Sequence, residues 1–184
     1  MINRVKSFAT ITLLTCTLLL GCNQTSDSAT GPQTFNTTYG AIEFTFPAGW
    51  FPNPDQHPYD LQCFSNNEQM NTGVFVFKQV DLAATTTPHD ILQRQVADMQ
   101  SKRENFKVLE AEQRYQRDDR NLTSVVYAGE KKLSRYIYRF TLIEFANDPS
   151  QFAVVLQVAV PGRWEKGKPI LNGITLSARS LNQP

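Results

Sequence analysis

Apolar residues at every second position mark the first strand of the folded part of the chain. Ile42, Phe44 and Phe46 alternate with more polar neighbours, which predicts a half-buried strand over residues 41–46. Residues 47–49, Pro-Ala-Gly, predict a turn directly after it. Residues 73–80 are instead a nearly continuous β-branched and aromatic run, which predicts an interior strand buried on both faces.

A helix with a capped start is predicted after this strand. Thr87 is suited to the N-cap and Pro88 to the first helical position, and Asp90 completes a capping box. The apolar residues at helical spacing predict one face packed on a sheet. They are Ile91, Leu92, Val96, Met99 and Phe106.

Four strand-like stretches follow, over residues 107–115, 121–128, 133–145 and 151–160. The polar segments between them are short, so the strands are expected to be antiparallel neighbours. In the third stretch, Tyr136, Tyr138, Phe140 and Leu142 share one face. The opposite face carries two arginines, Arg135 and Arg139, which predicts that it is the less buried face or the end of a sheet. A last helix is expected to begin near Pro169.

The pattern at the start of the chain is that of an export signal. Arg4 and Lys6 precede an apolar run over residues 8–20, which is shorter than the roughly 20 residues that a membrane-spanning helix needs. Removal of residues 1–21 leaves 163 residues with 16 basic and 17 acidic side chains, enough for one domain and without a charge excess that indicates nucleic acid. Residues 23–34 hold no large apolar side chain and predict a flexible tether.

The end of this signal, Leu19-Leu20-Gly21-Cys22, resembles the lipobox of bacterial lipoproteins. The resemblance implies cleavage between Gly21 and Cys22, and acylation of Cys22 with chains such as palmitate. An ordinary secretory signal cut elsewhere is the alternative, but Leu19 disturbs the small-residue spacing of such a site. In enteric lipoproteins an Asp after the lipidated Cys favours the inner membrane, so Asn23 implies, by the same resemblance, the outer membrane. We expect the domain to face the periplasm.

The folded part resembles the PsbP-like family, which includes DcrB-like envelope lipoproteins. The resemblance rests on Tyr39-Gly40, an aromatic-rich strand, Pro47-Ala48-Gly49-Trp50 and the order of elements up to Leu181. It implies an α+β fold, a single α/β/α sandwich with a central, mainly antiparallel sheet flanked by helices. The expected organisation is a signal peptide over residues 1–21, the lipidated cysteine and tether over 22–36, and the PsbP-like domain over 37–184.

Residues capable of catalysis or metal binding are sparse. Cys63 lies in a strand-like stretch and is expected to be a small buried residue, because only His57 and His89 are available as bases. Asp55, His57 and Asp60 can be drawn as metal ligands, although prolines separate them and a solvated loop is the favoured interpretation. We therefore expect no enzyme, no metal and no cofactor.

Two binding surfaces are considered. Arg135, Arg139 and Arg163 are candidates to hold an anionic group, although pairing with Glu43, Glu110 or Glu112 is the plainer account. Trp50, Phe51 and Trp164 form a possible partner surface if Trp164 is exposed, because aromatic residues are enriched at interface hot spots.

The function expected from these observations is that of a membrane-anchored envelope lipoprotein. Its domain would act as a non-enzymatic protein-binding or accessory module with an envelope protein as partner. Small-molecule or lipid binding is the alternative, in a pocket between the helices and the face of Tyr136, Tyr138 and Phe140. A hydrolase centred on His57 or His89 is a third hypothesis.

Overall fold

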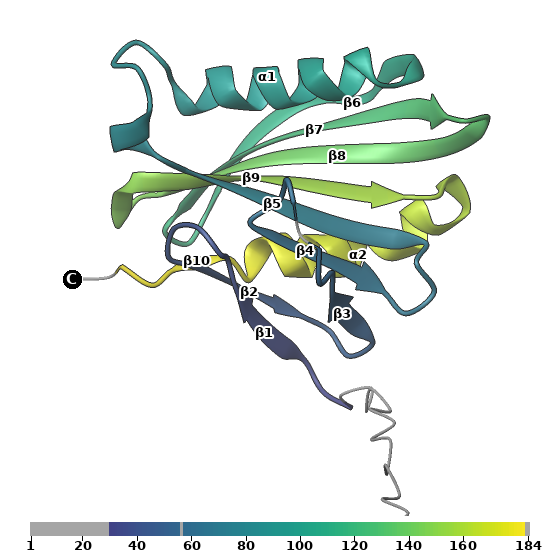
Figure 1. Cartoon of the computed structure of the whole chain (residues 1–184), viewed down its shortest axis with the longest axis horizontal. Coiled ribbons are helices and arrows are strands. Elements are labelled where there is room, and N and C mark those ends of the chain that lie inside the picture. The colour runs from purple at the N-terminus through teal and green to yellow at the C-terminus, as the bar shows by residue number, and fades with distance from the viewer. Residues whose placement is uncertain (1–29, 56, 183–184) are drawn as a thin grey trace, which may run out of the picture.

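A seven-stranded antiparallel sheet forms the centre of the protein, with layers on both of its faces (Figure 1). The computed structural model describes residues 30–55 and 57–182. The strands of this sheet follow the order β3-β4-β5-β9-β8-β7-β6. They are β3 (Trp50–Pro52), β4 (Leu61–Ser65), β5 (Met70–Lys78), β6 (Glu104–Arg117), β7 (Arg120–Lys131), β8 (Ser134–Phe145) and β9 (Asp148–Ala159).

Helix α1 (Pro88–Ser101) covers one face of this sheet, and helix α2 (Pro161–Leu176) lies on the other (Figure 1). A second sheet of order β1-β2-β10 shares the α2 side, and α2 packs on β2, β5, β8 and β9. Its strands are β1 (Gln33–Asn36), β2 (Ile42–Phe46) and β10 (Arg179–Ser180), and a short helix η1 (Gln79–Asp81) follows β5. The expected α+β sandwich with a mainly antiparallel sheet is confirmed.

The start of α1 is the one that the sequence predicts. The Thr87 side chain accepts a hydrogen bond from the Asp90 backbone, and the Asp90 side chain accepts one from the Thr87 backbone. Helix α1 then buries Ile91, Leu92 and Val96. Phe106 was expected on this helix, but α1 ends at Ser101 and Phe106 lies in β6, where its ring stacks on Tyr127 at 4.6 Å between centroids.

Strands β7, β8 and β9 form the long antiparallel meander that the sequence predicts. The register pairs Val126 of β7 with Arg139 of β8, and Arg139 with Gln157 of β9. Strand β5 pairs with β4 on one side and β9 on the other, so it lies inside the sheet as predicted, with Val74 and Val76 buried toward α2. Phe75 and Phe77 of the same strand pack on the α1 side.

The last helix begins earlier than the sequence predicts. It was expected near Pro169, but α2 starts at Pro161, and Pro169 lies inside it. Pro161 suits a first helical position as well as Pro169 does. Gly167 suggests a break in the sequence, yet here it allows the helix to approach β5, because a Cβ at this position would lie 2.5 Å from the sulfur of Met70.

The folded part begins before the expected boundary at residue 37. Residues 33–36 were assigned to the tether, but they form β1, and Phe35 of this strand packs edge-on against Phe46 of β2 at 5.8 Å. Antiparallel pairing with β2 and the packing of Phe35 hold this polar segment on the small sheet. Within the described residues, neither helix has the length and apolar character needed to cross a membrane.

Candidate functional site

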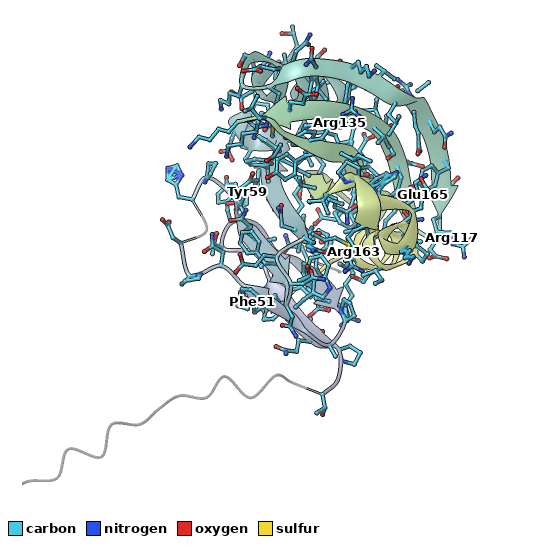
Figure 2. All side chains as sticks on the ribbon, turned by 90° about the vertical axis from the view of Figure 1, so that its right-hand side faces the viewer. Phe51, Tyr59, Arg117, Arg135, Arg163 and Glu165 are labelled. Carbon is cyan, nitrogen blue, oxygen red and sulfur yellow. The ribbon has the colours of Figure 1, made fainter. Side chains whose placement is uncertain are left out.

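The outer strands of the large sheet leave a pocket beside α2. Strands β6 and β7 extend beyond the strands on which α2 packs, and Figure 2 shows them curving past this helix. The pocket between them has a volume of about 660 Å³ and an open mouth. We call it the β6–α2 pocket, and its lining comes from β6, β7, β8 and α2. The side chains that matter below are Glu110, Arg114, Tyr115, Arg139, Trp164, Lys168 and Asn172.

Arg139 forms the floor of the β6–α2 pocket. It is on the face of β8 that points toward α2, and its side chain is 8% exposed. Its Nε donates to Oε1 of Gln157 at 2.8 Å, and Nη2 donates to the same oxygen. Its Nη1 donates to Oδ1 of Asn172 on α2. The two neighbouring elements, β9 and α2, therefore hold the guanidinium in a fixed position.

Helix α2 supplies one wall through residues spaced four apart. Trp164, Lys168, Asn172 and Leu176 all line the pocket, because residues four apart lie on the same side of a helix. Trp164 is 2% exposed, and its ring lies 5.9 Å from the Arg139 guanidinium carbon and 5.4 Å from Nζ of Lys168. Both cations thus contact one indole ring, an arrangement that favours positive charge near it.

Burial and nearby charges set the electrostatics of this site. Burial lowers the pKa of Arg139 to about 10, against smaller opposing effects of Tyr115 and Glu110. The side chain therefore carries its charge at neutral pH. A hydrogen bond to Glu110, with Nζ and Oε1 2.7 Å apart, raises the pKa of Lys168. Lys168 also pairs with Glu165 at 3.1 Å, so its charge is compensated, unlike that of Arg139.

A second, smaller pocket of about 520 Å³ lies farther along β6. Its lining is more apolar and includes Phe106, Leu109 and Ile137, with Arg135 and Glu130 also part of it. Arg135 pairs with Glu130 at 3.7 Å and has an exposed side chain. The charge of this arginine is already compensated, unlike that of Arg139.

The three arginines expected to share an anion lie apart. Arg139 lines the β6–α2 pocket, Arg135 the second pocket, and Arg163 donates a hydrogen bond to Gln69. Figure 2 shows Arg135 and Arg163 at separate places. The expectation that the arginine face of β8 is the less buried one is wrong for Arg139, because α2 covers it.

The plainer account, in which these arginines pair with three glutamates, is also wrong. Glu43 pairs with Arg179, and Glu110 pairs with Lys168 at 2.7 Å. Glu112 pairs with Arg114 at 2.9 Å. The reason is that α2 and β10, which the sequence pattern does not place in space, bring cations to Glu110 and Glu43, while Glu112 pairs within its own strand β6.

The proposed aromatic partner surface does not form. Trp50 is 5% exposed and packs on Phe46 at 5.6 Å between centroids, and Trp164 lies under the β6–α2 pocket. Only Phe51 of this set is exposed, and its ring stacks on Phe64. Trp50 and Trp164 are core residues because the small sheet and α2 cover them.

Of the three aromatic residues of β8 that were expected to line a ligand pocket, Tyr136 lines the second pocket, whereas the other two do not line either pocket described above. Tyr138 and Phe140 are buried in the core beneath α1, together with Leu92 and Val96. Burial raises the pKa of Tyr138, and its hydroxyl accepts a hydrogen bond from Nε of Arg103 at 2.8 Å. The pocket with polar groups lies instead on the opposite face of the same strand.

The candidate catalytic and metal residues lie outside the β6–α2 pocket. Cys63 is fully buried in β4, and burial raises its thiol pKa to about 12, so it is protonated at neutral pH. His89 is on the surface of α1, 3.7 Å from Glu112. His57 is exposed, and Asp60 accepts a backbone hydrogen bond from Val76 at 2.7 Å. Among the described residues no cluster of His, Cys, Asp and Glu is arranged to hold a metal.

Gly21 and Cys22, the expected cleavage and lipidation residues, lie outside the described residues. Sequence reasoning missed Lys168, Asn172 and Gln157 as site residues. The first two share the four-residue spacing that starts at Trp164, but this signal is visible only once the helix is known to begin at Pro161.

The architecture matches solved structures, whereas the sequence alone matches neither a family model nor a curated protein. Cyanobacterial PsbP (CyanoP) from Synechocystis sp. PCC 6803 is similar at a TM-score of 0.58 and 15% identity, over 82% of this chain and 93% of that one. The fold is therefore PsbP-like.

Two further structures share the PsbP-like fold. LpqN of Mycobacterium tuberculosis, described as involved in cell envelope biogenesis, has a TM-score of 0.59 at 12% identity, over 80% of this chain and 90% of its own. The Ran-binding protein Mog1p of Saccharomyces cerevisiae has a TM-score of 0.56 at 12% identity, over 83% and 97%. At these identities the likeness establishes the fold, which hosts different functions.

Proposed function

We propose that this protein is a lipid-anchored cell-envelope protein that works as a non-enzymatic binding module. The observation that carries the proposal is the β6–α2 pocket, an open cavity whose floor is a buried, rigidly held arginine. A charged group is costly to bury, so such a group beside an open cavity is best explained by something that binds there.

The anchor is the second part of this proposal. The Leu19-Leu20-Gly21-Cys22 sequence at the end of an export signal supports acylation of Cys22, with the outer membrane, facing the periplasm, as the proposed location. Two or more acyl chains hold a protein stably on a bilayer. The tether after Cys22 would keep the domain near the membrane, where its partner is expected.

A protein partner in the envelope is the primary candidate for what is bound. PsbP-like folds include a Ran-binding protein and a protein of envelope biogenesis, which supports a binding role for this fold. The chemistry of the pocket also supports binding rather than catalysis, because the buried Cys63 thiol stays protonated and neither histidine lines the cavity.

In-cell crosslinking of the intact protein tests this proposal, with a Cys22→Ser variant as the unanchored control. Metabolic labelling with palmitate in the same cells reports acylation. We expect label on the wild type alone and one reproducible envelope protein in the crosslinked product, with a lower yield for Cys22→Ser. Absence of label would refute the anchor, and crosslinks only between copies of this chain would refute the protein partner.

Binding of a small molecule is a second candidate, favoured by the size of the pocket. Its volume of about 660 Å³ falls within the roughly 300–1,000 Å³ of small-molecule sites. Native mass spectrometry of the full chain released from detergent would show an added mass. A single apo mass from several preparations would count against this candidate.

A further inference from the structure

The guanidinium of Arg139 is a buried charge without an acidic partner. Among the described residues no carboxylate lies within salt-bridge distance of it, whereas Arg114, Arg120, Arg135 and Arg179 all have one. Its hydrogen-bond partners, Gln157 and Asn172, are neutral amides. They orient the group but do not compensate its charge.

The same guanidinium has unused donors. It carries five N–H bonds, and three of them are taken by the two amide oxygens. One N–H on Nη1 and one on Nη2 therefore have no partner among the described side chains. A guanidinium N–H is a charge-assisted donor to the oxygens of a carboxylate or a phosphate.

The lining around Arg139 adds one more donor and does not compensate its charge. Trp164 contributes an indole Nε1 that is buried and has no hydrogen-bond partner in the described part of the chain. The charged lining residues are Glu110, Arg114, Arg139 and Lys168. Arg114 is paired with Glu112, and Lys168 is paired with Glu110 and Glu165. Glu110 is already held by Lys168, which leaves the charge of Arg139 as the uncompensated one.

We propose that the β6–α2 pocket binds an oxyanion, a carboxylate or phosphate group of its ligand, through Arg139, with Lys168 at the rim. This inference rests on the proposed binding function and names the chemical group that the pocket holds. The oxyanion comes either from a free small molecule or from an acidic side chain of a protein partner, and the two sources share the same contact.

A purely structural role for Arg139 is the competing explanation. Arg139 links β8 to β9 through Gln157 and to α2 through Asn172, and a link of this kind needs no ligand. In that case oxyanions would affect the protein only by ionic strength. The two explanations therefore differ in whether phosphate or acetate acts beyond the effect of chloride.

The indole N–H signals in the NMR spectrum report binding directly, because the chain has only two tryptophans. Trp164 lines the pocket, while Trp50 lies in the core by Phe46 and serves as the internal reference. The lipidated protein in maltoside micelles is titrated with inorganic phosphate, with acetate, and with sodium chloride at equal ionic strength. A Trp50→Phe variant assigns the two signals.

We expect a saturable shift of the Trp164 signal with phosphate or acetate, and none with chloride. Two charge-assisted hydrogen bonds correspond to a dissociation constant on the order of 1 mM. Arg139→Gln should weaken binding at least about tenfold. Lys168→Gln, at a partly exposed site, should weaken it about threefold and keeps the test valid if Arg139→Gln does not fold.

Arg135→Gln is the matched control, since this arginine lies on the same face of β8 but is paired with Glu130. It should leave the dissociation constant unchanged. Equal responses to phosphate, acetate and chloride would overturn the proposal, as would an unchanged affinity in a folded Arg139→Gln protein. If the wild-type protein crosslinked to its envelope partner no longer binds phosphate, the oxyanion belongs to the protein partner. If native mass spectrometry of the wild type shows an added small mass, the oxyanion belongs to a free ligand.

This result is separable from the proposed function. Oxyanion binding with no envelope partner in the crosslinking experiment would refute the protein-binding role and keep this inference. A partner that crosslinks equally well to wild type and to a folded Arg139→Gln variant would keep the protein-binding role and refute this inference.

Discussion

The two faces of the central sheet are covered to different extents. Toward α1, aromatic rings fill the space, with Phe77 stacked on Phe152 at 5.3 Å and Phe106 on Tyr127 at 4.6 Å. Toward α2, the helix and the small sheet cover the inner strands but leave the pocket beside β6. The difference indicates that one face mainly stabilises the fold, while the other can carry a group that is costly to bury.

Two of the buried charged residues on the α2 side, Asp148 and Arg139, sharpen this contrast. Asp148 is buried, and both of its oxygens are satisfied, Oδ1 by Ser150 and Oδ2 by Gln151 and Ser180. These hydrogen bonds tie β9 to β10. Arg139 keeps two donors free beside a cavity. A fully satisfied charge stabilises structure, whereas an incompletely satisfied one beside a cavity indicates binding.

The largest predicted effect is a loss of stability from a substitution on the α1 side of the sheet. Leu92→Ala removes a fully buried side chain of α1 and should lower the free energy of unfolding by about 2–5 kcal/mol, because a cavity remains. Leu176→Ala, at a half-buried residue of the pocket wall, should cost about 1 kcal/mol. Chemical denaturation measures both, and equal losses would contradict the difference between the faces.

A smaller and pH-dependent effect is expected for Asp148→Asn. Burial alone would raise the pKa of Asp148, but hydrogen bonds from Ser150, Ser180 and Gln151 outweigh it and lower the pKa below its usual 3.8. Because its pKa is lower in the folded state, Asp148 binds fewer protons there than in the unfolded chain. The resulting stabilisation is complete above the ordinary pKa of 3.8 and is lost as the pH falls through the folded pKa.

The variant should therefore be less stable than the wild type by about 1–3 kcal/mol at pH 7. This difference should shrink as the pH falls below 3.8. Urea denaturation at a series of pH values measures it. A difference that stays constant down to acid denaturation would show that the Asp148 network is not what stabilises this junction.

Arg139→Gln should change stability less than Asp148→Asn. The substitution loses hydrogen bonds to Gln157 and Asn172, but it also removes a buried charge whose desolvation is unfavourable. We expect a net loss of about 1 kcal/mol or less in chemical denaturation. A loss greater than that of Asp148→Asn would identify Arg139 as a structural link and weaken its assignment to a ligand.

The smallest effect is expected for Arg135→Gln. This arginine is exposed and its 3.7 Å pair with Glu130 is on the surface, so its removal should change the free energy of unfolding by less than about 0.5 kcal/mol. The same measurement serves as the reference for Arg139→Gln. A large loss of unfolding free energy in Arg135→Gln would show that a positive charge on this face of β8 stabilises the fold whether or not it is buried.

Much of the fold is predictable from the sequence because many of its elements follow from the residues within each element. The alternation at residues 42–46, the apolar run of β5 and the capping box at Thr87 all produce the expected elements. The predicted start of α2 was wrong because the helix was expected to begin near Pro169, while Pro161 is the start and burial of Trp164 belongs to the first turns of the helix. Tertiary packing overrides local propensity at that position.

The candidate site is harder to predict because it is assembled from distant segments. Glu110, Arg139 and Lys168 come from three elements, and only the curvature of the outer strands and the position of α2 bring them to one pocket. The alternation of residues in β8 assigns Arg139 to one face of the strand. It does not tell whether a helix covers that face. Exposure of tryptophan is equally invisible in the sequence, and Trp50 and Trp164 proved to be buried.

Site-specific photo-crosslinking in cells tests most directly whether the pocket side is the binding side. A benzophenone amino acid replaces Tyr115, an exposed residue that lines the β6–α2 pocket, or Val80, an exposed residue of η1 outside it. We expect an adduct from Tyr115, weakened by Arg139→Gln, and none from Val80. Equal adducts from both positions, or an adduct from Val80 alone, would contradict this expectation.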